Sequence, residues 1–143
     1  MTARPHHVRV KVPASSANLG PGFDCLALAV DIWNLVDFRP GGDRLVVHNS
    51  GMTSHYVPEN ADNLVVQAAK SVYQFIGEPF PAGLQVNCET HIPIRSGLGS
   101  SAAAILAGMG GANALLGSPL TPTQLLDLAG SMEGHLDNLA AAL

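Results

Sequence analysis

The sequence predicts an α+β fold made of a single domain, and three observations support this prediction. Segments with the period of β-strands gather toward the first half of the chain, and segments with the period of helices gather toward the second. The two kinds do not alternate regularly, as they would in a parallel α/β protein. The chain has 143 residues, of which 47% are hydrophobic, so it is long and apolar enough to bury one core.

Four segments have the pattern of strands. In residues 8–12, valines alternate with Arg9 and Lys11, which is the period of a half-buried strand, and Pro13 is expected to end it. A loop of small and polar residues, 14–24, should follow. The other strands are expected at 25–38, which is apolar and gives one strand or two, at 45–48, and at 83–91, where Leu84, Val86 and Cys88 share one side.

Three helices and the beginning of a fourth are expected. Asn60 or Asp62 can cap the first of them, and Gly77 can end it. Thr121 begins a capping-box pattern with proline at the first helical position. The expected helices cover 63–76, with Leu64, Ala68, Val72 and Phe75 on one face, then 100–116, 121–132, and 138–143, where an apolar run carries no stop signal.

Charge and composition argue against several classes of function. The net charge is −4 and the seven basic residues are scattered, so a basic patch for nucleic acid is not expected. Cys25 and Cys88 match neither a disulfide framework nor a zinc site. The first residues lack a signal-peptide pattern, and no apolar run reaches a membrane-spanning length. We therefore expect a cytoplasmic protein that binds neither nucleic acid nor a membrane.

The segment from Pro93 to Ala103, Pro-Ile-Arg-Ser-Gly-Leu-Gly-Ser-Ser-Ala-Ala, is the strongest chemical signal. It lies between an expected strand and an expected helix. Glycines allow tight turns that bring backbone N–H groups to an anion, and the first turn of a helix adds unpaired N–H donors at its positive end. The segment therefore predicts a phosphate site, in which the hydroxyl of Ser101 could add an oxygen ligand for Mg²⁺.

The same letters also fit other structures. An ordinary Gly-rich turn capped by Ser100 is about as compatible with a bare Gly-Leu-Gly-Ser-Ser as a phosphate loop is. A Walker A loop would need a lysine, and this segment has none. Gly97, Gly99 and Ala102 formally satisfy the Rossmann pattern. However, the acidic residue at the required distance, Asp127, lies in a helical pattern rather than at the end of a second strand.

Three separated motifs carry a resemblance to a known family. The loop segment resembles the phosphate loop of the GHMP kinases, which act on galactose, homoserine, mevalonate and phosphomevalonate. Residues 13–24, Pro-Ala-Ser-Ser-Ala-Asn-Leu-Gly-Pro-Gly-Phe-Asp, resemble the amino-terminal signature of the homoserine kinases within that family. Residues 133–138, Glu-Gly-His-Leu-Asp-Asn, are similar to a third motif of the same branch, with Leu136 in place of its proline.

The resemblance implies a fold, ligands and residue roles. It implies the amino-terminal GHMP domain, with a left-handed βαβ unit related to a ribosomal-protein domain, and it implies ATP and Mg²⁺. On the residues alone, Asn63 would be nearly as good a helix cap, and Glu133 a surface carboxylate. By resemblance, Pro93, Ser96, Gly97, Leu98, Gly99, Ser100, Ser101 and Ala102 hold the phosphates, Ser101 and Glu133 hold Mg²⁺, Asn63 meets adenine, Asn18, Asp24, His135 and Asn138 bind L-homoserine, and Ser101, Glu133 and Asn138 serve catalysis.

The implied reaction is transfer of the γ-phosphoryl group of ATP to the side-chain hydroxyl of L-homoserine, in threonine biosynthesis. Positioning and charge neutralisation do most of the work in such a transfer. No Asp–Lys pair stands out as a general base, and His135 and Asp137 are weak candidates. Residues 14–20 argue against a GHMP kinase for another small alcohol. A nucleotide-binding domain without activity of its own is the remaining alternative.

Composition and resemblance also predict that the chain is part of a longer enzyme. Only 13% of the residues are charged, about half of the usual share of roughly 25%, as expected if some of the surface is normally covered. GHMP kinases are considerably longer and have a carboxy-terminal domain that this sequence lacks. We therefore expect residues 1–143 to form the ATP-binding domain and to be inactive or barely active alone. Self-association, for example as a homodimer, is expected through exposed apolar surface.

Overall fold

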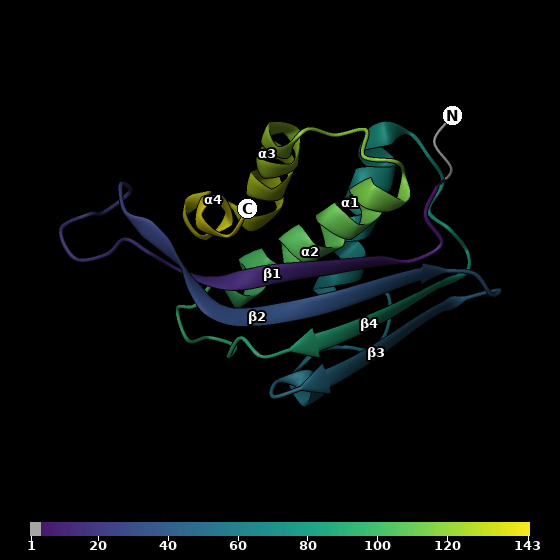
Figure 1. The fold of residues 1–143 in the computed structure, drawn as a ribbon, viewed down its shortest axis with the longest axis horizontal. Coiled ribbons are helices and arrows are strands. Elements are labelled where there is room, and N and C mark those ends of the chain that lie inside the picture. Colours follow the sequence, from purple (N-terminus) through teal and green to yellow (C-terminus); the bar gives the residue numbers. More distant parts are fainter. Residues whose placement is uncertain (1–3) are drawn as a thin grey trace.

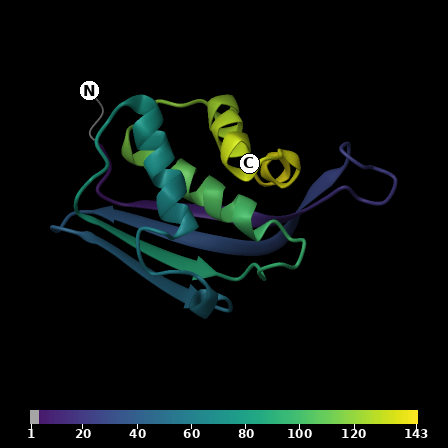
Figure 2. The ribbon, with the colours of Figure 1, turned by 180° about the vertical axis from the view of Figure 1, so that it is seen from behind.

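The computed structural model describes residues 4–143 and shows a β-sheet with helices packed on one face (Figure 1). The strands are β1 (Val8–Ala17), β2 (Ala27–Pro40), β3 (Leu45–Gly51) and β4 (Leu84–Thr90). Across the described part of the sheet their order is β1-β2-β4-β3, with β1 and β3 at the edges. The view from behind shows the same two layers, and no helix of residues 4–143 covers the second face of the sheet (Figure 2).

Two of the strands belong to a parallel βαβ unit. β3 and β4 are parallel, with Val47 opposite Val86, and helix α1 (Leu64–Ile76) connects them along the chain after the short 3-10 helix η1 (Ser54–Tyr56). β1 and β4 are both antiparallel to β2. The sheet is therefore mixed, and helices and strands do not alternate regularly, which confirms the α+β class.

The other helices follow β4 and complete the helical layer. α2 (Ser100–Leu115) packs against α1, β1 and β2, while α3 (Pro122–Glu133) packs on α2, and α4 (Asp137–Ala142) packs on β1 and β2. Large side chains such as Phe38, Met109 and Leu139 are fully buried between the layers. Burying one such side chain contributes roughly 1.5–3 kcal/mol. None of the helices in residues 4–143 is both long and apolar enough to cross a membrane.

Strand β1 continues past Pro13, so the expectation that proline would end it is wrong. Pro13 lies opposite Trp33 on β2, and the register shifts between Pro13 and Ala14. Because β1 is an edge strand with one neighbour, it tolerates a residue without an N–H, and prolines in sheets occur at edges and bulges. The extra length carries Ser15 alongside the Gly-rich loop.

Helix α1 differs from the expectation at its cap and on its buried face. Its N-cap is Asn63, whose side-chain oxygen accepts a hydrogen bond from the N–H of Val65, so neither Asn60 nor Asp62 caps it. Phe75 was expected on the buried face but is 59% exposed. The buried residues of the helix are Val65, Val66, Ala68, Ala69, Val72 and Tyr73, and Phe75 lies at the edge of the face that they form.

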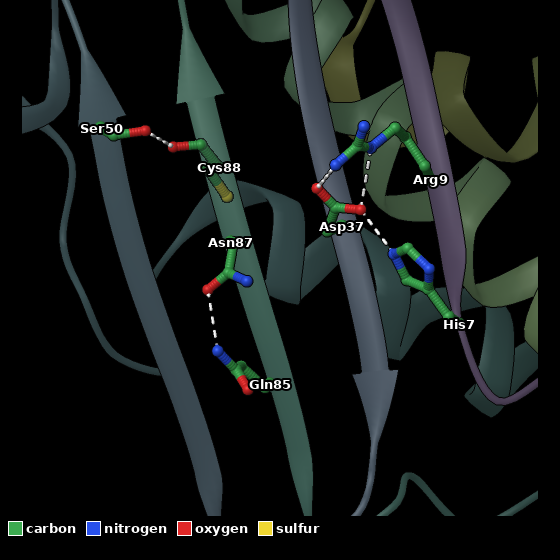
Figure 3. A network of polar contacts seen from close by, with 7 residues as sticks. All are labelled: His7, Arg9, Asp37, Ser50, Gln85, Asn87 and Cys88. Carbon is green, nitrogen blue, oxygen red and sulfur yellow. Dashed lines mark hydrogen bonds and ion pairs between the residues drawn. The ribbon is translucent and has the colours of Figure 1, made fainter.

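The open face of the sheet carries polar contacts, which Figure 3 shows from close by. Asp37 on β2 accepts hydrogen bonds from Nε and Nη2 of Arg9 on β1, at 3.0 and 2.9 Å, and also contacts His7. The hydrogen bond from Arg9 is the main cause that lowers the pKa of Asp37 below its usual 3.8. Gln85 and Asn87 on β4 form a further pair on this face. The contacts of Asp37 join the beginning of edge strand β1 to β2.

Candidate functional site

The Gly-rich loop between β4 and α2 is held at both ends by buried residues. At its start, the side-chain oxygen of Asn34 accepts hydrogen bonds from the N–H groups of His91 and Ile92, at 2.8 and 3.0 Å. At its end, the N–H of Ser15 on β1 donates to the carbonyl of Leu98 over 3.0 Å. Asn34 is 4% and Ser15 0% exposed, so the loop is fastened to the interior of the protein.

Two glycines shape the turn into α2. Gly97 and Gly99 have φ angles of +74° and +69°, in the left-handed region that glycine adopts readily. A Cβ on Gly99 would lie 2.4 Å from the hydroxyl of Ser15 and 3.3 Å from Asn138, so this backbone passes directly against both side chains. A Cβ on Gly97 would meet nothing within 4 Å, so the space above it is open.

The first turn of α2 has the properties of an anion-binding site. The helix begins at Ser100, as predicted, with Gly99 as its N-cap and no side-chain hydrogen bond at the cap. The first N–H groups of an α-helix have no acceptor within the helix, and the positive end of the helix dipole lies there. The backbone from 100 to 102 can therefore donate to an anion placed over the loop.

Ser101 and Glu133 meet beside this turn. The hydroxyl of Ser101 donates to Oε1 of Glu133 over 2.5 Å. Glu133 is the last residue of α3, where a helix dipole disfavours negative charge, yet its carboxylate reaches the first turn of α2, where the dipole favours it. Gly134, with a φ of +92°, then ends α3. A carboxylate at the end of α3 does not stabilise that helix. Its position is explained instead by its interaction with the positive end of α2.

These groups line one cavity of about 450 Å³. Of the residues predicted to bind phosphate, those from Ser96 to Ser101 lie on its wall, whereas Pro93 does not and Ala102 is buried in the core. Pro93 instead accepts a hydrogen bond from the hydroxyl of Ser96 over 2.7 Å, which closes a turn within the loop. The rest of the wall consists of Glu133, His135 and Asn138 from the other predicted sets, with Val57, Leu64, Ile94, Arg95 and Ala104.

Asn18 and Asp24 lie in a different hollow, of about 220 Å³, between the β1–β2 connection and α4. Asn18 accepts a hydrogen bond from the N–H of Asp24 at 2.8 Å and donates one to the carboxylate of Asp137 at 3.0 Å. Asp137 lines this hollow, and the next residue, Asn138, lines the larger cavity, so the start of α4 divides the two. The four residues predicted to bind substrate are therefore shared between two adjoining spaces.

Asn63, which was predicted to meet adenine, is fully buried as the cap of α1. Its amide nitrogen donates to the carbonyl of Pro58 at 2.9 Å and to the side-chain oxygen of Asn49 at 3.3 Å. It lines a narrow hollow of about 50 Å³ that shares Val57 and Leu64 with the main cavity. The amide N–H groups of Asn63 therefore already have acceptors within the protein. A direct contact of Asn63 with a nucleotide base stays a prediction.

Cys88 on β4 lines the same narrow hollow but has no reactive thiolate. It is 2% exposed, and burial raises the pKa of its thiol to about 12. A thiol with such a pKa remains protonated near neutral pH and behaves as a small apolar group. Both cysteines were expected to be reduced core residues; Cys88 is a free cysteine in the core, whereas Cys25 is exposed, so the expectation is wrong for Cys25.

Sequence reasoning missed the two residues that fasten the loop. Ser15 lies within the motif of residues 13–24, but the expected end of the strand at Pro13 placed it in a loop. Its hydroxyl also donates to Oδ1 of Asn138 over 3.1 Å, which links the first strand to the last helix. Asn34 offered one signal, since it is a polar residue within the apolar segment 25–38.

Comparison with known proteins gives a family model and relatives. The model described as GHMP kinases N terminal domain matches residues 63–143. The homoserine kinase of Synechococcus sp. is 47% identical over 137 residues, which cover 95% of this chain and 44% of that protein. The homoserine kinase of Carboxydothermus hydrogenoformans is 41% identical over 136 residues, again covering 95% and 44%. The chain thus spans less than half the length of the curated relatives that it matches.

Solved structures agree with the sequence comparison. The crystal structure of homoserine kinase from Cytophaga hutchinsonii matches with a TM-score of 0.83 and 29% identity, covering 98% of this chain and 47% of that one. The mevalonate kinase of Methanococcus jannaschii matches with a TM-score of 0.74 and 15% identity, covering 97% and 52%. At that identity the second likeness concerns the fold alone.

Proposed function

This chain belongs to the GHMP kinase family, and we propose that it is the ATP-binding part of a homoserine kinase. The reaction is transfer of the γ-phosphoryl group of ATP to the side-chain hydroxyl of L-homoserine, which gives ADP and O-phospho-L-homoserine. Threonine biosynthesis in the cytoplasm is the setting that this activity implies. In this proposal the chain supplies the nucleotide cradle and one side of the substrate site.

The observation that carries the proposal is the wall of the larger cavity. The loop and the first turn of α2, whose first N–H groups have no acceptor within the helix, line this cavity beside the open space at Gly97, and Glu133 lies on the same wall. Such N–H groups suit the phosphates of a nucleotide. A cavity of about 450 Å³ falls within the usual range of small-molecule sites, roughly 300–1,000 Å³.

Ser101 and Glu133 fit Mg²⁺ through the chemistry of their oxygens. Mg²⁺ is usually held by one or two carboxylates together with substrate phosphates and water, rather than by a cage of protein side chains. In residues 4–143, no group of three or more His, Cys, Asp or Glu side chains could hold a metal alone. A hydroxyl and a carboxylate beside the phosphate cradle match the first arrangement. When bound, Mg²⁺ would neutralise charge on the phosphates.

The acceptor binds where the two spaces adjoin, at the start of α4. The exposed carboxylate of Asp24 can pair with the ammonium group of homoserine, and a charge-assisted hydrogen bond contributes roughly 1.5–3 kcal/mol. Asn18 bonds both the backbone of Asp24 and the side chain of Asp137, so it orients this side of the site. Asn138 lies against Gly99, where its amide can hold the acceptor hydroxyl toward the phosphates.

Transfer in this proposal depends on alignment rather than on a dedicated base. His135 lies on the wall of the phosphate cavity, and Asp137 already accepts a hydrogen bond from Asn18. Holding the hydroxyl in line with the γ-phosphate supplies most of the rate enhancement in phosphoryl transfer. His135 and Asp137 therefore remain secondary candidates for accepting the hydroxyl proton.

A coupled assay of ADP release with Mg-ATP tests the proposal. L-homoserine, mevalonate and galactose are offered in turn as acceptors, with a reaction lacking acceptor as the control. With a carboxy-terminal GHMP domain supplied, release that depends on L-homoserine and exceeds that with the other two alcohols is the expected result, whereas the chain alone should release little or no ADP. Equal release with mevalonate would favour another branch of the family. That result would contradict the assignment that rests on the motif of residues 13–24 and on the similarity to homoserine kinases at 41–47% identity.

A second candidate is nucleotide binding without turnover by this chain alone. The hollow beside Asp24 is lined by two carboxylates, those of Asp24 and Asp137, and by no lysine or arginine within the described residues. The carboxylate of homoserine therefore meets no cation there, and we expect the chain to hold this substrate weakly. ATP binding with no homoserine-dependent release would favour this candidate. Phe23, Leu26 and Leu28 are exposed apolar residues in the segment beside this hollow. Such surface is compatible with self-association, which stays a prediction.

A further inference from the structure

Arg95 has an unusual backbone conformation at the edge of the phosphate cavity. Its φ is +58°, in the left-handed region, although it carries a side chain. This conformation is unfavourable for an L-residue, and residues held in it cluster at functional sites, where the surrounding structure enforces it. Arg95 lies two residues before Gly97 in a loop that Asn34 and Ser15 fasten at both ends. The fixed ends explain how the loop can hold Arg95 in this conformation.

Arg95 borders two spaces, which also have Ile94 in common. It lies on the wall of the 450 Å³ cavity, together with Ser96 and Gly97, and it also lines a neighbouring hollow of about 440 Å³ with Tyr56 and Ile94. The residue is exposed. None of the ion pairs found within residues 4–143 includes it. Its guanidinium is therefore available to a ligand in the cavity.

The positive charge of Arg95 distinguishes it from the other residues of the cavity wall. Among the residues that line the cavity in the described part of the chain, Arg95 is the sole lysine or arginine, and Glu133 is the sole carboxylate. A nucleotide triphosphate is highly anionic, and backbone N–H groups contribute only partial charges to its binding. A planar guanidinium can donate two parallel hydrogen bonds to phosphate oxygens, which a neutral side chain cannot do.

We propose that Arg95 binds the phosphates of the nucleotide and supplies the fixed positive charge that this lysine-free loop otherwise lacks. This inference rests on the proposed nucleotide binding and assigns a phosphate contact to a residue outside the loop's glycines and serines. In this proposal the left-handed backbone of Arg95 serves to direct its guanidinium toward the cavity. Arg95 is a binding residue in this proposal, since it touches the substrate ATP.

Isothermal titration of ATP, ADP and AMP into the wild-type chain and its variants tests the inference. Arg95→Gln removes the charge, Arg95→Lys retains it, and Arg44→Gln is a matched control at an exposed arginine on the wall of a separate hollow. Arg95→Gln should weaken ATP about tenfold, the equivalent of one charge-assisted contact at an exposed site. The affinity for ADP should fall less than that for ATP, and the affinity for AMP should fall least. Arg95→Lys should lose only part of the affinity for ATP, and Arg44→Gln should lose none of it.

Arg95→Gly separates binding from folding. Glycine adopts a left-handed φ freely, so this variant should melt at the same or a higher temperature than the wild type while losing ATP as Arg95→Gln does. ATP binding that is unchanged in both variants, or weakened equally for ATP, ADP and AMP, would overturn the inference and leave the proposed function standing. A wild-type chain that binds no Mg-ATP would overturn both.

Discussion

The hydroxyl of Ser101 donates a hydrogen bond to Oε1 of Glu133 over 2.5 Å, which joins the first turn of α2 to the last residue of α3. The two residues are 32 positions apart in the chain. The contact places a hydroxyl and a carboxylate at the positive end of α2, where the Gly-rich loop turns. In the proposed function, the binding of Mg-ATP depends on these two oxygens acting together.

Gly99 should be the glycine of the loop that tolerates substitution least. Gly99→Ala combines a left-handed φ with an overlap of its Cβ with the Ser15 hydroxyl, so the free energy of unfolding should fall by roughly 3 kcal/mol or more. The control Gly117→Ala has a φ of +86° and meets nothing within 4 Å, so only the backbone cost of roughly 1–2 kcal/mol should apply. Urea unfolding of both variants measures the difference.

A double-mutant cycle locates the source of that cost. Ser15→Ala alone should lose roughly 1 kcal/mol, because its buried hydroxyl no longer bonds Asn138. In Ser15→Ala/Gly99→Ala the overlap is relieved, so the double variant should be more stable than the sum of the single effects by about 1 kcal/mol. Strictly additive losses would show that the contact of Gly99 with Ser15 is not what limits residue 99.

Asn63 should be the cap that stabilises α1. Asn63→Ala removes the bond to Val65 and the bonds to Pro58 and Asn49, and the free energy of unfolding should fall by at least roughly 1–2 kcal/mol. Asp62→Ala, one residue earlier and exposed, should change stability by no more than about 0.5 kcal/mol. Thermal melts of both proteins would count against the structure if Asp62→Ala proved the more damaging change.

The ion pair of Asp37 should make stability depend on pH at acid pH. Because the pKa of Asp37 is lowered in the folded state, chiefly by the hydrogen bond from Arg9, its contribution is fully present above the usual value of 3.8 and is lost as pH falls below it. Asp37→Asn should therefore be less stable than the wild type near neutral pH, with the gap narrowing below about pH 4. Urea unfolding from pH 3 to 7 measures this gap. Asp43→Asn, at an exposed turn, controls for the loss of one charge, and a gap that widened on acidification would refute the assignment.

Much of the fold follows from local patterns in the sequence. The start of α2 at Ser100 and the capping box at Thr121 were predictable because helix starts depend on residues that are adjacent in the chain. The expectation that Pro13 would end its strand was wrong because the effect of a proline depends on whether its strand lies at the edge of the sheet. The local sequence does not carry that information. The cap of α1 was misplaced among three neighbouring polar residues, each of which could cap a helix.

The candidate site was predictable where its residues are contiguous and less so where the fold brings them together. The loop from Ser96 to Ser101 lies on the cavity wall as a unit. The partners of that loop, Ser15 and Asn34, come from two other strands and hold it through one and two hydrogen bonds respectively, which no spacing in the sequence reveals. The separation of Asp24 from Asn138 by the start of α4 also depends on tertiary structure.

The most direct test of the central claim is the affinity for ATP of the wild type, Glu133→Gln and Asp127→Asn, each measured by titration calorimetry with Mg²⁺ and with a chelator. Asp127 is an exposed carboxylate on the same helix, so its variant matches the loss of charge. We predict that Glu133→Gln weakens Mg-ATP about tenfold or more, equivalent to one charged contact, and leaves metal-free ATP unchanged, while Asp127→Asn behaves as the wild type. Wild-type affinity for Mg-ATP in Glu133→Gln, or an equal loss with and without Mg²⁺, would contradict the claim.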